Sequence, residues 1–442
     1  MTPRPRPRRS LLALPLLALA LCILSAALWP RPARAVDYNF AGSVSLNYKT
    51  LVNELDNSNA RDQRTLMMPG FNVNAAVKAV VDVSPYLSAS VKMCYGCHGL
   101  EIIGFVAELT SHRAFNVRVG RFQPSFGDFY MRHDPTIHKT PDNPLPYDMG
   151  HMVRLREWNM GVLPVPYSDN GAEAYGTLRF SDNLSLSYAA HVVSGWKGAD
   201  TSAATAAPNQ DFAYRRMRFV TANDYLVDNN RWPSFGGRAA LTFARGRAMS
   251  AAIPDITLGG SAMYGTYDDE DRLRYLFLGA DIYVHLWRIN LRAEVLRRQM
   301  DIDPRQSQLE DGTVVGSLNK NGVGPPVYRK DGFYVESDFP LGRFLEGVLR
   351  WDGMRRSGAK PSRTDPDRPP ASYTAPAAAV LDQEDWILRY TVGLNVIPLT
   401  GVKIKLAYEL WTFKNVDDPY RLTAALPFHN EHMVHIAAVA GF

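Results

Sequence analysis

The fold is decided by residues 402–411, VKIKLAYELW, in which two kinds of side chain alternate. Apolar residues stand at the even positions, and mostly charged residues stand between them. Successive side chains of a β-strand point to opposite faces, so this period of two predicts a strand with one apolar and one polar face. Residues 38–48 and 386–396 repeat the pattern.

About sixteen such segments follow one another along the chain. We predict strands at 38–50, 70–82, 86–94, 100–110, 114–122, 172–180, 184–194, 236–245, 255–265, 273–286, 289–300, 332–339, 343–352, 385–396, 401–413 and 431–442. The connections between them are alternately short and mostly long. A soluble sandwich would also alternate, but strands of about ten residues with aromatic ends are typical of barrels that cross a membrane. We therefore predict an all-β, transmembrane antiparallel β-barrel of about 16 strands with long extracellular loops.

One turn provides an internal check on this pattern. Trp287 and Arg288 separate two predicted strands, so Leu286 and Ile289 should pair across a two-residue turn. Both residues then fall on the apolar face of the sheet, so the predicted pairing agrees with the alternation in the two strands.

The first 35 residues have the features of a signal peptide. A basic start is followed by an apolar run and by Ala33-Arg34-Ala35, an A-x-A cleavage site. An uncleaved membrane helix is the alternative. We expect residues 36–442 to form the barrel, in the outer membrane of a Gram-negative bacterium. Cys22 would be discarded with the leader.

The charge balance argues against a nucleic-acid partner. The chain has a formal net charge of +5, and residues 1–35 contain six arginines and no acidic residue, which leaves +5 − 6 = −1 for the remainder. A basic surface that binds nucleic acid is not expected.

The motif that could carry chemistry is Cys94-Tyr95-Gly96-Cys97-His98. It reads C-x-x-C-H, the attachment sequence of a c-type haem. Cys94 and Cys97 would bond to the porphyrin, and His98 would supply an axial ligand to the iron. The alternative is a plain disulfide between Cys94 and Cys97. The motif lies in the predicted hairpin 86–110, where the alternation directs Cys94 into the lumen, together with Lys92 and Glu108, and Ile103 and Phe105 toward lipid.

The long loop 123–171 follows the fifth predicted strand. In this position it resembles the loop of sixteen-stranded porins that folds into the lumen, and the resemblance implies the same course here. The loop contains histidines and methionines, which are the usual sixth ligands of haem iron. The candidates are His133, His138, Met149 and His151, with Met67 and Met68 of the first long loop as competitors. The alternative is a constriction loop that only filters solutes. Lumen-facing charges are of mixed sign and predict no ion selectivity.

Three stretches resemble known families. The last predicted strand ends in Phe442 and resembles the C-terminal signal of bacterial outer-membrane proteins, which implies the barrel assembly machinery as a partner. Residues 119–127, VGRFQPSFG, resemble a strand-to-loop stretch of phosphate-selective-type porins. One C-x-x-C-H in a porin-sized barrel is similar to the fused cytochrome–porins of iron-oxidising bacteria. Their motif precedes the first strand, so the resemblance implies a haem-bearing porin but not iron as the electron donor.

These features predict a porin-like cytochrome c, with one covalent haem c at the pore mouth, that transfers electrons at or across the outer membrane or gates a pore. A passive diffusion porin for small solutes, with a Cys94–Cys97 disulfide, is the main alternative. A haem enzyme is a further one, although a carrier or channel is expected rather than a catalyst. One haem cannot bridge an apolar band of about 25 Å, so a periplasmic cytochrome is implied as a partner. The sequence leaves the oligomeric state open.

Overall fold

The computed structural model describes ten stretches of the chain: residues 37–52, 70–96, 99–148, 161–196, 230–246, 253–268, 271–301, 327–358, 385–414 and 430–442. Apart from Asp37, they belong to a compact unit that spans Tyr38–Phe442. The predicted signal peptide, residues 1–35, lies outside these stretches. No helix within them has both the length and the apolar character needed to cross a membrane.

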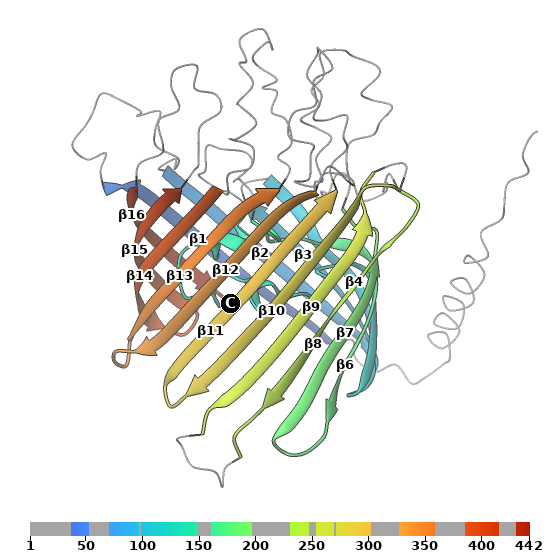
Figure 1. Cartoon of the computed structure of the whole chain (residues 1–442). Coiled ribbons are helices and arrows are strands. Elements are labelled where there is room, and N and C mark those ends of the chain that lie inside the picture. The colour runs from blue at the N-terminus through green and yellow to red at the C-terminus, as the bar shows by residue number, and fades with distance from the viewer. Residues whose placement is uncertain are drawn as a thin grey trace, which may run out of the picture. The chain divides into compact units, whose positions relative to one another are not determined.

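The described stretches contain sixteen strands, one for each predicted segment (Figure 1). They are β1 (Asp37–Leu51), β2 (Gly70–Ser84), β3 (Leu87–Gly96), β4 (Gly99–His112), β5 (Phe115–Phe122), β6 (Asp169–Arg179), β7 (Leu184–Val193), β8 (Ser234–Phe243), β9 (Asp255–Thr266), β10 (Arg274–Leu286), β11 (Ile289–Asp301), β12 (Val327–Pro340), β13 (Leu345–Gly358), β14 (Asp385–Leu399), β15 (Val402–Lys414) and β16 (Glu431–Gly441).

The strands form one closed antiparallel barrel, as predicted. Each pairs with its neighbours in the sequence, and β1 closes the barrel against β16. Leu286 pairs with Ile289 across the Trp287-Arg288 turn, which confirms the register expected there. Closure leaves no sheet edge, so every strand finds its backbone hydrogen-bond partners within the barrel.

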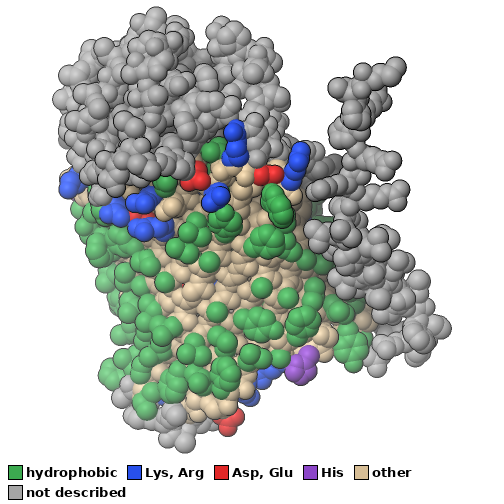
Figure 2. Space-filling model, turned by 45° about the vertical axis from the view of Figure 1, so that its right-hand side comes forward, with side chains coloured by type: hydrophobic (Ala, Val, Ile, Leu, Met, Phe, Trp, Pro, Cys, Tyr) green, Lys and Arg blue, Asp and Glu red, His purple; other side chains and the backbone are tan. Residues whose placement is uncertain are grey.

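The outer surface of the barrel is apolar over most of its height (Figure 2). Outward residues such as Phe105, Val295 and Val392 have 71%, 57% and 58% of their surface exposed. Alternating inward residues are buried and often charged, such as Glu294 and Arg389. A barrel with an apolar outside and a polar inside is suited to lipid around it and a wet lumen within.

The connection from β5 to β6 folds into the barrel, which confirms the expectation for this loop. Its described residues, 123–148 and 161–168, include two 3-10 turns, η2 (Tyr130–Arg132) and η3 (Leu145–Tyr147). In Figure 1 this segment lies between the front and back walls of the barrel. We call these residues the lumen loop.

Two sequence-based expectations need correction. Ile103 does not face lipid but is buried, with 7% of its surface exposed. A β-bulge causes this, because Lys92 pairs with Gly104 while the next residue, Met93, pairs with Ile102. The extra residue in β4 leaves Ile103 unpaired and reverses the facing of the positions beyond it.

The second correction concerns β12 and β13, which extend further than the predicted segments 332–339 and 343–352. The additional strand residues lie at the rim of the barrel that carries the long loops. Charged residues occupy outward positions there, so the apolar alternation stops before the strand does.

Candidate functional site

Cys94 lies near the upper end of β3, close to the rim of the long loops, and its side chain faces the lumen. It pairs with Ala76 of β2 and with Glu101 of β4. The expected inward orientation of Cys94 is therefore confirmed. Cys97 and His98, the other haem-motif residues, lie outside the described stretches.

Cys94 borders a cavity between the lumen loop and the wall formed by β1 to β4, with β15 and β16 contributing Lys405, His435 and Val439. This wall contributes mainly uncharged polar side chains to the lining: Ser43, Ser45 and Asn47 from β1, and Asn72 and Asn74 from β2. The cavity follows β1 from Ser43 to Lys49, a run of seven residues that spans roughly 20 Å at the rise of a strand. Gly70 and Gly96, at the upper strand ends, also line it. We call this region the cavity side.

Two of the four candidate sixth ligands line the same cavity as Cys94. They are His133 and His138 of the lumen loop, whose ring centroids lie 5.4 Å apart. His138 is 7% exposed, and its ring lies 5.1 Å from that of Phe129. Its Nε2 is buried without a hydrogen-bond partner among the described residues. Met149 and His151, like Met67 and Met68, lie outside the described stretches.

The surroundings of His138 keep its imidazole neutral. Burial lowers the pKa of His138 well below its usual range, and the positive charge of Lys405 lowers it further. A neutral imidazole with a free ring nitrogen is the form that binds a transition metal. Among the described candidates, His138 thus combines a place at the cavity of Cys94 with a ring nitrogen that has no hydrogen-bond partner.

Lysines and arginines of the wall hold the lumen loop in place. The Lys405 ammonium donates to the backbone carbonyls of Pro135 and His138 at 2.8 Å each, and of Thr140 at 3.3 Å. Arg389 donates to the Asn143 carbonyl at 2.6 Å. Carbonyl oxygens inside a barrel would otherwise lack partners, so these bonds stabilise the folded loop against the wall.

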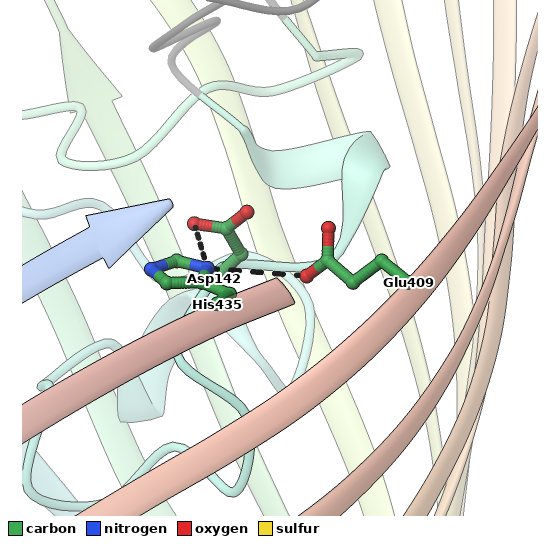
Figure 3. A group of neighbouring side chains, drawn as sticks. All are labelled: Asp142, Glu409 and His435. Carbon is green, nitrogen blue, oxygen red and sulfur yellow. Dashed lines mark ion pairs between the residues drawn. The ribbon is translucent and has the colours of Figure 1, made fainter. Parts of the chain in front are cut away.

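A charged cluster ties the loop to β1, β15 and β16. Asp142 forms an ion pair with Lys49, and its Oδ1 lies 3.4 Å from Nδ1 of His435. Glu409 approaches the same ring nitrogen of His435, with Oε1 4.0 Å from Nδ1 (Figure 3). Burial would raise the pKa of Asp142, but Lys49 and His435 lower it well below the ordinary value.

Asp142, Glu409 and His435 also satisfy the spacing of a metal site, since their ligand atoms lie within 4.8 Å of one another. However, Lys49 and Arg389 already face these carboxylates, at 3.8 Å from Glu409 in both cases. A divalent cation would have to displace two buried cations. We assign this cluster to loop anchoring.

The opposite part of the lumen is filled. Loop and wall share one apolar cluster, to which the loop contributes Phe126, Phe129, Tyr130, Tyr147, Val162, Leu163, Val165 and Tyr167, and the wall Met263, Tyr275, Phe277, Leu296 and Tyr334. Trp196 and Tyr267 complete it. The wall residues come from β9 to β12, and we call this region the filled side.

Buried carboxylates of β11, on the filled side, and of β6 also fix the loop. Glu294 of β11 accepts a 2.5 Å hydrogen bond from the Tyr147 hydroxyl and also accepts from the backbone N–H groups of Asp128 and Phe129. Glu173 of β6 accepts from the backbone N–H of Ser125 at 2.8 Å. Each carboxylate thus binds donors that the turns of the loop leave free.

The predicted lumen charges are largely paired with one another or with the loop. The alternating pattern of the sequence puts Arg350, Arg389 and Glu409 between apolar residues and so on the inward face, and their burial agrees with this. It did not indicate Lys49, Asp352 or His435 as loop-binding residues. Their inward phase could be read from the alternation, but their partners come from strands and a loop far away in the sequence.

Comparisons with known proteins show the fold. No protein-family model matches the chain, and no curated protein matches it. Among solved structures, OmpF of Salmonella typhi matches with a TM-score of 0.50 at 9% identity, over 92% of this chain and 97% of that one. The outer-membrane channel DcaP of Acinetobacter baumannii gives 0.49 at 9% identity, over 93% and 99%. An anion-selective porin of Comamonas acidovorans gives 0.48 at 9%, over 92% and 100%.

The chain therefore has the sixteen-stranded fold of outer-membrane porins. A closed barrel of even strand number with an apolar outer band is the form in which bacterial chains cross the outer membrane. The outer membrane of a Gram-negative bacterium is its location.

Proposed function

We propose that this barrel is a narrow porin-like channel whose passage runs along the cavity side. The observation that carries the proposal is the contrast within the lumen. The filled side is closed by the apolar cluster, while the cavity side keeps a polar lining from Ser43 up to the ends of β2 and β3. A passage of this kind conducts ions and small polar solutes more slowly than an open porin of the same strand number.

The test uses two neighbouring residues of β2 that face opposite ways. Asn74 lines the cavity, whereas Val73 faces outward with 42% of its surface exposed. In planar bilayers, Asn74→Trp should reduce the single-channel conductance severalfold, and Val73→Trp should leave it near the wild-type value. A folded wild-type barrel that conducts nothing, or equal conductance in all three proteins, would reject this channel.

The second candidate function is that of a haem-bearing channel. We propose that Cys94 and Cys97 attach one c-type haem and that His98 binds its iron. Two observations support this proposal: Cys94 borders a cavity that also contains His133 and His138, and the buried Nε2 of His138 lacks a hydrogen-bond partner in the described part of the chain. When bound, a c-type haem supplies one-electron redox chemistry.

The residues of the chain then have distinct roles toward the haem. His138 would occupy the sixth position of the iron, and the lumen loop would hold the ring of His138 against Phe129. Electrons would have to enter or leave through a second redox protein, since one haem does not bridge the apolar band. A periplasmic cytochrome that docks at the lower rim is the proposed partner.

Attachment and ligation are tested separately. Haem should stay on the denatured chain, and Cys97→Ser should abolish the haem stain of that band. His138→Ala should convert a low-spin spectrum to high spin and allow carbon monoxide to bind, while the matched variant His133→Ala should not. A low-spin spectrum in His138→Ala would instead favour Met149 or His151.

The two candidates are separated by one comparison. If haem occupies the cavity, Cys94→Ser/Cys97→Ser should conduct better than the wild type because the passage is cleared. If the chain is a haem-free channel, the wild type carries no haem stain and the double variant conducts equally.

A further inference from the structure

Three asparagine side chains border the cavity of the lumen from two directions. Asn72 and Asn74 lie two residues apart on β2, so both point to the inner face, and Asn143 belongs to the lumen loop. All three are half-buried, and none of their side-chain amides has a hydrogen-bond partner within the described stretches. Each amide offers two donors and one acceptor, so the cavity is lined by groups that can bind a solute.

His138 of the lumen loop adds a buried polar atom to this lining. Its Nε2 has no hydrogen-bond partner among the described residues, although the side chain is buried. Lys405 binds the backbone carbonyl of His138 at 2.8 Å, and Lys405 and Asn47 lie in one row of the wall because both pair with Ala437. A buried nitrogen without a partner costs free energy, which a bound hydroxyl group can offset.

Most charged groups of the lining already bind other groups of the protein. Lys49 forms an ion pair with Asp142, and the Lys405 ammonium donates to three carbonyls of the lumen loop. Glu101, which pairs with Cys94 near the upper rim, adds one carboxylate. A charged solute would have to compete with these ion pairs after losing its own water, whereas an uncharged polar solute would not.

The lumen loop also contributes apolar surface to the cavity. Pro135, Pro141, Val165 and Pro166 border it, while the wall opposite presents mainly serines and asparagines. Sites for small molecules commonly combine apolar surface with a few polar groups that fix the orientation of the ligand. A solute with hydroxyl groups at its edge and C–H groups on its faces matches both parts of this lining.

We propose that this cavity binds an uncharged sugar of the size of a monosaccharide. Its hydroxyl groups bind the amides of Asn74 and Asn143 and the Nε2 of His138, and its C–H faces lie on the proline rings. A hydroxyl group both donates and accepts, so it suits amides and an imidazole alike. Binding inside a passage has to remain weak enough for release. The inference rests on the proposed channel, because the haem of the second candidate would occupy the same cavity.

The test is a saturation-transfer NMR titration of the full chain in detergent with glucose, and with glucosamine and glucose 6-phosphate as charged comparisons. The wild type should bind glucose about tenfold more tightly than either charged sugar. Asn74→Leu removes an amide from the cavity and should weaken glucose binding about fivefold. Val73→Leu changes the outward neighbour on the same strand and should leave glucose binding unchanged.

The titration needs no conduction, so it separates the sugar site from the channel. Glucose binding by a barrel that conducts nothing would reject the channel and support the site. A conducting barrel that binds all three sugars equally, or an equal loss in Asn74→Leu and Val73→Leu, would overturn the sugar site. If Asn74→Leu fails to fold, as judged by its mobility in an unheated gel, Asn143→Leu provides the test, with about a fivefold loss expected. Unchanged glucose binding in that variant would overturn the proposal as well.

Discussion

The filled side and the cavity side of the lumen differ in what their strands present to the same loop. On the filled side, β9 to β12 present large apolar and aromatic residues, and the lumen loop packs against them in one cluster. On the cavity side, β1 and β2 present serines and asparagines, and a cavity remains. One loop thus fills one half of the barrel and borders a cavity in the other half, because only the filled side offers large apolar side chains against which the loop can be buried.

The largest effect on this difference between the two sides is expected when a charged residue that holds the lumen loop against the wall is removed. Arg389 is fully buried, and its guanidinium binds Asp352 at 2.6 and 3.0 Å as well as the Asn143 carbonyl. Arg389→Met removes the bidentate partner of buried Asp352, which keeps Arg350 at 3.3 Å, and should cost about 3 kcal/mol of stability. The measurement is the urea midpoint of unfolding, with the exposed turn residue Arg343→Met as control. Similar midpoints for both variants would contradict the anchoring role.

A smaller effect is expected from Asp142, whose side chain is 21% exposed. Asp142→Asn removes the ion pair with Lys49 and should cost about 2 kcal/mol at neutral pH. The folded pKa of Asp142 is depressed, so its contribution is present above the unfolded pKa of about 3.9 and is lost as the pH falls through the folded value. The stability difference between wild type and variant should therefore persist at pH 5 and shrink below about pH 4.

The exposed turn residue Asp182 provides the matched control for this titration. Asp182→Asn should have the same stability as the wild type at both pH values. A stability difference between wild type and Asp142→Asn that grows as the pH falls from 7 to 4 would contradict a lowered pKa of Asp142 in the folded protein.

The filled side can be loosened with a single methyl group. Gly127 has φ +54°, and a Cβ there would meet the Tyr147 hydroxyl and the Glu294 carboxylate. Gly127→Ala should destabilise the loop by about 1.5 kcal/mol and raise the channel conductance, because the loop must shift. Gly260→Ala is the matched control, since its Cβ would have no neighbour within 4 Å. Conductance unchanged by Gly127→Ala would show that the filled side does not limit the passage.

Most of the fold could be predicted from the sequence because a membrane barrel imposes one rule on every strand. The alternation of apolar and polar residues predicted all sixteen strands and the inward orientation of Cys94. The prediction failed where another requirement replaced that rule: at Ile103, where a bulge inserts one residue, and at residues 327–331 and 353–358, where outward positions carry Arg and Asp at the lipid boundary.

The site was predicted only in part, for a different reason. The inward course of the loop was implied by the resemblance to sixteen-stranded porins, and His133 and His138 indeed share a cavity with Cys94. The pairing of Asp142 with Lys49 joins residues 93 positions apart, and no local pattern encodes it. Which half of the lumen is filled depends on side chains from four strands together, so it could be seen only in the folded barrel.

The most direct test of the two-sided lumen compares two inward positions as cysteines in a Cys94→Ser/Cys97→Ser background. Asn74 borders the cavity, whereas Ser261 of β9 accepts a 2.9 Å hydrogen bond from the Gly127 backbone N–H beneath the loop. A charged thiol reagent should modify Asn74→Cys rapidly and reduce the conductance, while Ser261→Cys should stay unmodified in the folded protein. Equal rates at both positions, or faster modification of Ser261→Cys, would contradict the account.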